Sequence, residues 1–321
     1  MSRPLAAIDL GSNTIRLLVA EADAATGLRP IWAEQVIARL GEGLTRRDTL
    51  APVAMERALA AVRAFRDRAA TLGAAEVLVV ATAAVRDAAN RDEFLARLRP
   101  EPRLHSRVVS GEEEARLTLL GVLWGLGGVI GPFCLLDIGG GSTEFLVGRD
   151  ATVLAAVSLR LGVVALCERF FHTDPVDRTE YDACAAHVGA RLTAEAWPTI
   201  RPLGPRALVG TAGTITTLAA LDLGLASYDP MRVQGHRLTV EAVDALRLQL
   251  GALPLNERAQ LPCLEPGRAD LIVPGIAIAL AALRGLGHGA LTVADTGFRE
   301  GILLDAAGWS PPVRRAEDRT D

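Results

Sequence analysis

The first half of the chain alternates short apolar runs with longer amphipathic ones. The apolar runs at 4–10, 15–22 and 31–38 are predicted strands, because each is short and bounded by polar or turn-forming residues. From Pro52 onward, apolar residues recur at three- and four-residue steps, which predicts an amphipathic helix. The pattern then predicts, in order, a strand at 77–82, a helix through 92–98, a strand at 107–109 and a helix from Gly111. Such alternation of strands and helices is typical of an α/β fold.

The second half repeats the opening pattern. Two apolar strands again flank a glycine turn, now at 139–141. When Asp9 is aligned with Asp137, the glycine and hydroxyl residues of the two turns coincide. A duplicated strand, turn and strand predicts two similar domains that face each other across a cleft. A third glycine turn, GTAGT at 210–214, follows another predicted strand and opens a helix.

A run without charged residues extends from Leu117 to Leu136. Its length would suit a membrane-spanning helix, but several glycines and Pro132 interrupt it. We interpret it as a helix end, a turn and a buried strand. No membrane association is therefore predicted from this segment.

The length of 321 residues suggests two domains, since a single core seldom grows so large. The predicted domains are residues 1–124 and 125–309. A helix at about 300–309 is expected to pack back on the first domain. The final residues, 310–321, open with Ser-Pro-Pro and are predicted to be a disordered tail.

All 34 basic side chains are arginine, and the chain contains no lysine. This excludes Schiff-base chemistry and a Walker A phosphate loop, both of which need a lysine. The net charge of −4 and the lack of an arginine-rich run argue against nucleic-acid or membrane partners. Four irregularly spaced cysteines indicate neither a disulfide framework nor a zinc site. Together with the absence of a recognisable signal peptide, this predicts a cytoplasmic protein.

The two Asp-Gly turns are candidate phosphate sites. A turn of small residues lets successive main-chain N–H groups converge on an anion, and the neighbouring hydroxyls add donors. A single such turn is more often an ordinary hairpin, but two matched copies favour a phosphate-binding cleft. The candidate residues are Gly11, Ser12, Asn13, Thr14, Gly139, Gly140, Gly141, Ser142 and Thr143.

The aspartates that precede the turns are candidate metal ligands. Mg²⁺ prefers one or two carboxylates together with water and phosphate oxygens, so Asp9 and Asp137 could hold it between the turns. The alternative is that each aspartate accepts main-chain hydrogen bonds within its own turn, and the two roles are compatible.

Two glutamates are candidates for acid–base chemistry. Ser110 and Glu113 form a predicted capping box, which leaves Glu114 about 100° round the helix and free to face the cleft. A carboxylate there could deprotonate water for attack on a terminal phosphate. Glu144 follows the second turn, and its counterpart after the first turn is Arg16. This divergence would place an acid on one wall of the cleft and a base on the other, although both could be ordinary strand side chains.

The chain resembles the Ppx/GppA exopolyphosphatase and guanosine pentaphosphate phosphohydrolase family of the actin-like ATPase superfamily. The resemblance runs from about residue 5 to 305, with the motifs in the family order. They are AIDLGSNTIRLLV, RLGEGL, ATAAVRDAANRDEF, SGEEEARL, LLDIGGGSTEF, VGTAGTITTLAAL, GRADLIVPG and VADTGFREG. It implies two similar actin-like, ribonuclease H-like α/β domains with an inter-domain cleft, in a short two-domain form of the family.

The resemblance also implies roles for individual residues. The catalytic glutamate falls on Glu114, and the metal- and water-positioning carboxylates fall on Asp137 and Glu144. The phosphate-binding arginines fall on Arg16, Arg86 and Arg268. The third glycine turn, represented by Gly210, Thr211 and Gly213, contacts the nucleotide in kinase-like relatives of the superfamily.

The function implied is a Mg²⁺- or Mn²⁺-dependent exopolyphosphatase that releases orthophosphate from the end of inorganic polyphosphate. The nearest alternative is hydrolysis of guanosine pentaphosphate in the stringent response. A phosphotransferase between polyphosphate or ATP and an acceptor is a further alternative, as is a non-catalytic sensor. A homodimer is expected.

Overall fold

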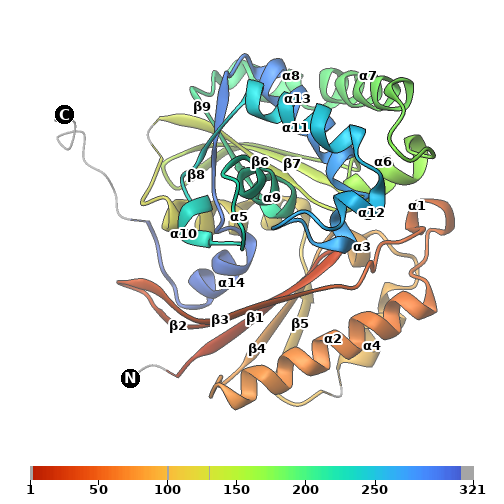
Figure 1. The fold of residues 1–321 in the computed structure, drawn as a ribbon. Helices are drawn as coiled ribbons and strands as arrows, with labels where there is room; N and C mark the ends of the chain where they lie inside the picture. Colours follow the sequence, from red (N-terminus) through yellow and green to blue (C-terminus); the bar gives the residue numbers. More distant parts are fainter. Residues whose placement is uncertain (1–2, 100, 130, 312–321) are drawn as a thin grey trace.

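The structure is a computed structural model that describes residues 3–99, 101–129 and 131–311. Of the predicted tail, 310–321, residues 312–321 lie outside the described part. Each half of the chain builds one mixed sheet with helices packed on it, and the two halves lie one above the other in Figure 1.

The first sheet has the strand order β3-β2-β1-β4-β5. Its first three strands form an antiparallel meander, and the last two run parallel to β1. The strands are β1 (Leu5–Leu10), β2 (Thr14–Asp23), β3 (Gly27–Ile37), β4 (Val77–Ala81) and β5 (Leu104–Val108). The helices of this half are α1 (Leu44–Arg47), α2 (Pro52–Thr71), α3 (Ala83–Arg86), α4 (Arg91–Leu98) and α5 (Gly111–Gly125).

The second sheet has the order β10-β11-β9-β6-β7-β8. Its strands are β6 (Pro132–Ile138), β7 (Thr143–Arg149), β8 (Thr152–Leu159), β9 (Ala207–Thr211), β10 (Arg237–Thr239) and β11 (Ala290–Val293). The remaining elements are α6 (Val163–Phe170), α7 (Arg178–Glu195), α8 (Trp197–Ile200), η1 (Arg201–Leu203), α9 (Ala212–Asp222), α10 (Pro230–Val233), α11 (Val240–Ala252), α12 (Leu255–Arg258), η2 (Pro266–Arg268), α13 (Ile272–Leu286) and α14 (Phe298–Ala306).

The two sheets repeat one topology. In the second sheet, β6, β7 and β8 form an antiparallel meander, and β9 and β11 continue it in parallel, as β4 and β5 do in the first. The repeat extends to the strand register. Asp9 lies opposite Arg16 across β1 and β2, and Asp137 lies opposite Glu144 across β6 and β7. The duplication expected from the sequence is therefore present in the fold.

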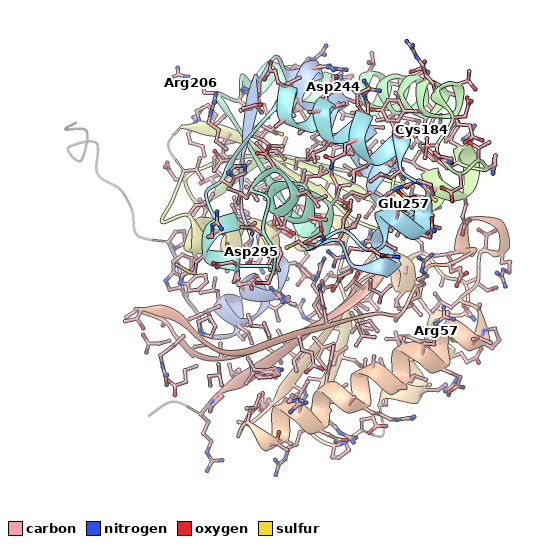
Figure 2. The ribbon with its side chains drawn as sticks, in the orientation of Figure 1. Arg57, Cys184, Arg206, Asp244, Glu257 and Asp295 are labelled. Carbon is pink, nitrogen blue, oxygen red and sulfur yellow. The ribbon has the colours of Figure 1, made fainter. Side chains whose placement is uncertain are left out.

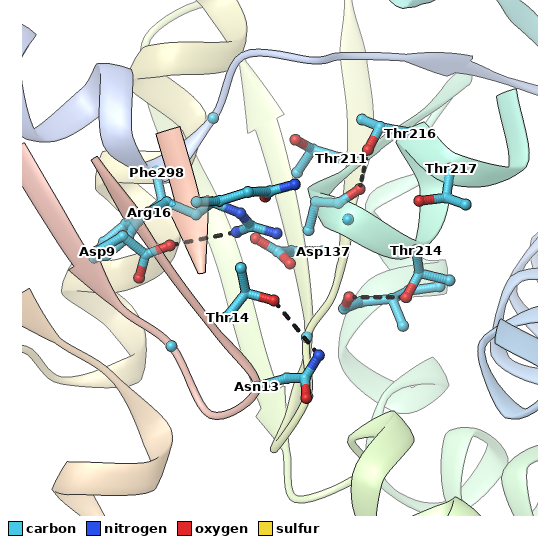
Figure 3. Close-up of a pocket in the computed structure, with 18 of the residues that line it drawn as sticks. Asp9, Asn13, Thr14, Arg16, Asp137, Thr211, Thr214, Thr216, Thr217 and Phe298 are labelled. Carbon is cyan, nitrogen blue, oxygen red and sulfur yellow. Dashed lines mark hydrogen bonds and ion pairs between the residues drawn. The ribbon is translucent and has the colours of Figure 1, made fainter. Parts of the chain in front are cut away.

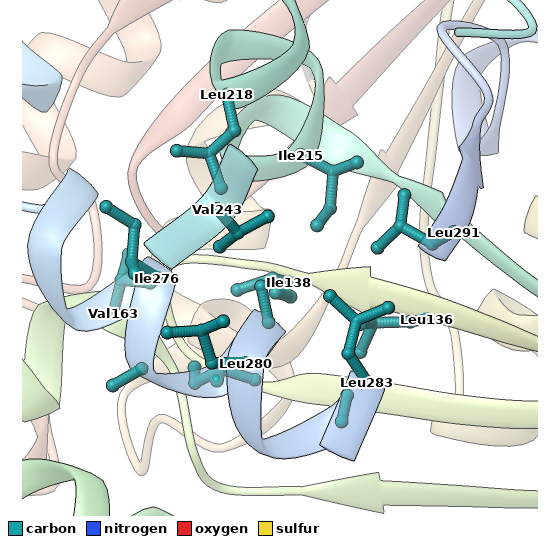
Figure 4. Packing of buried hydrophobic residues seen from close by; sticks show 14 of the residues in the cluster. Leu136, Ile138, Val163, Ile215, Leu218, Val243, Ile276, Leu280, Leu283 and Leu291 are labelled. Atoms are coloured by element: carbon teal, nitrogen blue, oxygen red, sulfur yellow. The ribbon is translucent and has the colours of Figure 1, made fainter. Parts of the chain in front are cut away.

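The largest apolar core lies in the second half, where α13 packs on the sheet. This helix is buried almost all round, which explains why its sequence is apolar on every face. Figure 4 shows its side chains meeting those of β6, α9 and α11. Residues that meet there are Leu136, Ile138, Ile215, Val243, Ile276, Leu280, Leu283 and Leu291. In the first half, α2 covers the sheet with the apolar face that its periodicity predicted.

The uncharged segment is a helix end, a turn and a strand, as interpreted. Helix α5 ends at Gly125 and strand β6 begins at Pro132. Among the described residues, no helix combines the length and the apolarity needed to cross a membrane. Helix α14 lies against α5 and β1, and glycines make the approach close: a Cβ at Gly121 or at Gly301 would collide with the main chain of the other helix or of the turn before it.

Several predicted boundaries differ from the structure; the strand predicted at 107–109, for example, spans Leu104–Val108 as β5. Strand β3 begins at Gly27, earlier than the predicted 31, because an edge strand tolerates Pro30 and a bulge between Val19 and Ala20 absorbs the irregularity. Arg268, one of the predicted phosphate-binding arginines, ends the short helix η2, and α13 begins only at Ile272.

Candidate active site

A cavity of about 520 Å³ lies between the two halves, and most of the candidate residues line it. Both glycine turns, both aspartates and part of the third turn reach it from different elements (Figure 3). The candidates that line it are Asp9, Gly11, Ser12, Asn13, Thr14, Arg16, Glu114, Asp137, Gly139, Gly140, Gly141, Ser142, Glu144, Thr211, Gly213 and Arg268.

The two glycine turns touch each other at one end of the cavity. A Cβ on Gly140 would lie 3.0 Å from the main-chain nitrogen of Asn13, and one on Gly141 would collide with Ser12 Oγ. None of the glycines in these two turns has a positive φ. Gly140 and Gly141 are therefore needed for the close approach of the two turns and not for an unusual backbone conformation.

Four of the carboxylates that line the cavity, those of Asp9, Glu114, Asp137 and Glu144, have little access to water. Burial raises the pKa of Asp137 to about 6, although Arg16 acts against it, and burial also raises the pKa of Asp9. The pKa of Glu144 is raised well above its usual value, first by burial and then by the charges of Glu114 and Asp137. Such a cluster is short of positive charge, which favours binding of a cation or of protons.

Glu114 faces the cavity from the first turn of α5. Its side chain is 13% exposed, and its carboxylate accepts a hydrogen bond from Arg86 Nη1 at 2.9 Å. Burial raises the pKa of Glu114 to about 7, although Arg86 acts in the opposite direction. The capping box is only half formed: Ser110 Oγ accepts from the Glu113 N–H at 3.1 Å, whereas the Glu113 carboxylate pairs with Arg107.

Arg16 and Arg268 present guanidinium groups to the cavity from opposite halves. Arg16 pairs with Asp9 at 3.4 Å. Burial, and then the nearby charge of Arg16, lower the pKa of Arg268 to about 10. Arg268 also pairs with Glu265 at 3.1 Å, but the two guanidinium groups still repel each other, so this part of the cavity is suited to a polyanion.

Three candidates do not line the cavity. The Arg86 guanidinium is turned to Glu114 and to the carbonyl of Val109, at 3.2 Å. The Thr143 hydroxyl donates to the carbonyl of Leu161 at 2.6 Å and is fully buried. Gly210 lies inside β9. The first two were assigned to phosphate, but in this structure their polar groups are used within the protein.

Sequence reasoning assigned no role to several residues that also line the cavity. Arg299 reaches it from the first turn of α14, and Asp295 lies beside α10 and α14 between the two halves (Figure 2). Burial opposes the charge of Arg299, but the carboxylates of Glu300, Asp295 and Asp9 outweigh it and raise its pKa. The available signal was Asp295-Thr296-Gly297, a third Asp-x-Gly sequence at the end of a strand.

Comparison with known proteins decides the family. The model of the Ppx/GppA phosphatase family matches residues 18–308. The chain belongs to the Ppx/GppA phosphatase family.

The curated relatives include proteins named exopolyphosphatase and a protein named as a guanosine pentaphosphate-cleaving enzyme. Exopolyphosphatase 2 of Mycobacterium tuberculosis is 36% identical, with 95% of this chain and 98% of that protein covered. Exopolyphosphatase 1 of the same organism is 31% identical, with 94% and 87% covered. A guanosine-5'-triphosphate,3'-diphosphate pyrophosphatase of Aeromonas hydrophila is also 31% identical, but the chain spans only 61% of that protein.

Solved structures of Ppx/GppA proteins match the fold over nearly the whole chain. The Aquifex aeolicus family member is 32% identical with a TM-score of 0.79, covering 95% of this chain and 97% of that one. An exopolyphosphatase from Cytophaga hutchinsonii is 26% identical with a TM-score of 0.86, covering 95% and 98%. The predicted α/β fold class, with two halves of the same topology, is confirmed.

Proposed function

We propose that the protein is an exopolyphosphatase that hydrolyses the terminal phosphoanhydride bond of inorganic polyphosphate and releases orthophosphate. The observation that carries the proposal is the position of Glu114, a buried carboxylate at the cavity wall beside two facing glycine turns. The relatives named exopolyphosphatase support it, since they align over most of this chain.

In this reaction Glu114 acts as the general base. It takes a proton from the attacking water while the main-chain N–H groups of the two turns stabilise the charge on the transferred phosphoryl group. Glu144 is held by a hydrogen bond from Ser158 Oγ at 2.8 Å and helps to orient the water. Arg16 and Arg268 bind the phosphates that follow the terminal one, and Arg86 keeps Glu114 in position.

The site fits a divalent cation that is completed by substrate. Asp9, Asp137 and Glu144 supply the carboxylate oxygens that Mg²⁺ or Mn²⁺ prefers. Within the described part of the chain, however, no three potential ligands are arranged to hold a metal by themselves. Phosphate oxygens and water would therefore complete the coordination. When bound, the ion would neutralise charge on the phosphate oxygens.

Hydrolysis of guanosine pentaphosphate is the second candidate. The relative from Aeromonas hydrophila carries a name of this type, and the same bond is attacked by the same groups. A cytoplasmic location, a part in the stringent response, a homodimer and the lack of nucleic-acid partners remain predictions from the sequence.

The deciding experiment measures phosphate release from polyphosphate and from guanosine pentaphosphate at matched concentrations with Mg²⁺. A higher kcat/KM for polyphosphate is expected. A preference for the nucleotide would select the second candidate, and formation of ATP from polyphosphate and ADP would instead indicate a phosphotransferase. Release from neither substrate would contradict the proposal.

A further inference from the structure

The segment after β3 holds the first glycine turn in place. The main-chain N–H groups of Ala38 and Arg39 both donate to the carbonyl of Asn13, at 3.0 and 2.9 Å, and that of Gly41 donates to the carbonyl of Ser12 at 2.8 Å. Arg39 has a φ of 48°, a left-handed conformation that residues with a Cβ seldom adopt. The direction of the Arg39 side chain is thus fixed by the segment that shapes the turn.

The Arg39 side chain crosses to the second half of the molecule. Its Nη1 and Nη2 atoms donate to the two carboxylate oxygens of Asp270, each at 3.0 Å, and Nη2 also donates to the carbonyl of Gly267 at 3.1 Å. The two side chains are 34% and 26% exposed. A two-pronged pair of this kind fixes orientation as well as distance.

The same contact includes Arg268, which lies between Gly267 and Asp270 in the chain. Arg268 Nη2 donates to Gln35 Oε1 at 3.0 Å, and Gln35 Nε2 donates to Glu265 Oε1 at 2.7 Å. Residues of the first half therefore hold the segment 265–270 on both sides of Arg268. The Arg268 guanidinium also pairs with Glu265 at 3.1 Å and donates to Gly213 O and Thr217 Oγ1, each at 3.4 Å, within its own half, so contacts with both halves locate it.

This junction differs from the one formed by α5 and α14. There, glycines bring main chains into direct packing, so separation would leave voids. At the Arg39 junction Gly267 packs against the Ile37 side chain, but the Arg39–Asp270 pair is partly exposed, so water can replace its hydrogen bonds when the halves separate. The Arg39 junction is thus the one suited to open and close, while the α5 and α14 junction stays together.

We propose that Arg39 is a positioning residue of the hydrolytic site: its pair with Asp270 closes the cavity and places Arg268 opposite the first glycine turn. The inference rests on the proposed function for its substrate, but the closure itself is independent of catalysis. Because substrate would bind the closed form, loss of the pair lowers the closed fraction and weakens apparent affinity. At saturation, bound substrate restores closure, so kcat changes little.

The test compares Arg39→Ala, Asp270→Ala and the double variant with the wild-type protein. With tripolyphosphate and Mg²⁺, we expect KM for phosphate release to rise about tenfold in each single variant and no further in the double variant, since both remove one contact. The change in kcat is expected to stay within about threefold. Arg39→Lys keeps the positive charge but cannot make the two-pronged contact, so its KM should lie between those of the wild type and Arg39→Ala.

Small-angle scattering of the substrate-free proteins tests closure without any enzymatic readout. We expect a larger radius of gyration for Arg39→Ala than for the wild type. The matched control is Arg97→Ala, which removes an ion pair with Glu56 within the first half; the Arg97 side chain is also 34% exposed. The control should leave both KM and the radius of gyration unchanged.

The outcomes separate this inference from the proposed function. A wild-type protein that releases no phosphate contradicts the function, and the scattering result then decides closure alone. An active wild type with unchanged KM and radius in folded Arg39→Ala overturns the inference, as does a loss confined to kcat, which is the sign of a smaller folded fraction. If Arg39→Ala does not fold, Asp270→Asn provides the same comparison.

Discussion

Replacing Glu114 with glutamine should stabilise the metal-free protein at neutral and higher pH while removing most of its activity. The side chain is 13% exposed, and burial raises the pKa of Glu114 from 4.5 to about 7. Each unit of pKa shift corresponds to about 1.4 kcal/mol, so ionising this group costs the folded state about 3 kcal/mol. Glutamine resembles the neutral acid and avoids that cost.

The sign of the effect depends on pH. Below the unfolded pKa of 4.5, the carboxyl is protonated in both states and contributes no difference. As the pH rises from 4.5 through about 7, the unfolded state loses its proton first, so the wild type loses stability and the variant does not. The stability advantage of Glu114→Gln should grow from near zero at about pH 4.5 to about 3 kcal/mol at about pH 8.

Thermal unfolding followed by circular dichroism, with a chelator present, measures this difference. At about pH 8 we expect the Tm of Glu114→Gln to exceed that of the wild type by about 5 °C or more. Mg²⁺ should reduce the gap, because a cation compensates the carboxylates. Glu113→Gln is the control, since the Glu113 carboxylate pairs with Arg107 at the surface. An equal difference in Tm at about pH 4.5 and at about pH 8, or no difference at about pH 8, would refute the reasoning about buried charge.

Four other outcomes can be measured with the wild-type protein and single-residue variants. The kcat of Glu114→Gln should fall by about 100-fold or more, with KM for tripolyphosphate nearly unchanged, in steady-state phosphate release. Wild-type kcat/KM should decline as the pH falls through about 7, because burial raises the pKa of Glu114 to about 7 and the base must be ionised; a bound cation would move the decline to lower pH. Gly141→Ala should lower both activity and stability, by about 1–3 kcal/mol in chemical denaturation, since its Cβ would collide with Ser12 Oγ. Removal of divalent cations with a chelator should abolish phosphate release, and adding Mg²⁺ should restore it; full activity in the chelator would contradict a metal requirement.

The features that the sequence predicted well depend on neighbouring residues. The two glycine turns follow from a repeated strand and turn pattern, and the direction of Glu114 follows from the cap formed by Ser110 only a few residues away. Both were predictable because short-range geometry decides them. Helix and strand alternation likewise predicted the class of the fold.

The features that escaped prediction depend on contacts between distant segments. Arg86 was assigned to phosphate, but its guanidinium donates to Glu114, 28 positions further along the chain. Arg39 and Asp270 lie 231 positions apart, so no local pattern joins them. Thr143 illustrates a smaller limit, because its hydroxyl turns inward to Leu161 while the adjacent Ser142 lines the cavity.

The difference between Arg16 and Glu144 in the duplicated register gives the cavity a direction. Arg16 and Glu144 occupy equivalent positions after the two turns, opposite Asp9 and Asp137 in their hairpins. Equal charges at these two positions would remove one of the differences that orient a linear polyanion. On the function proposed above, the chain end lies toward the carboxylates and the remaining phosphates lie toward the arginines. A polymer held in this polarity would be shortened from its end and not cut internally.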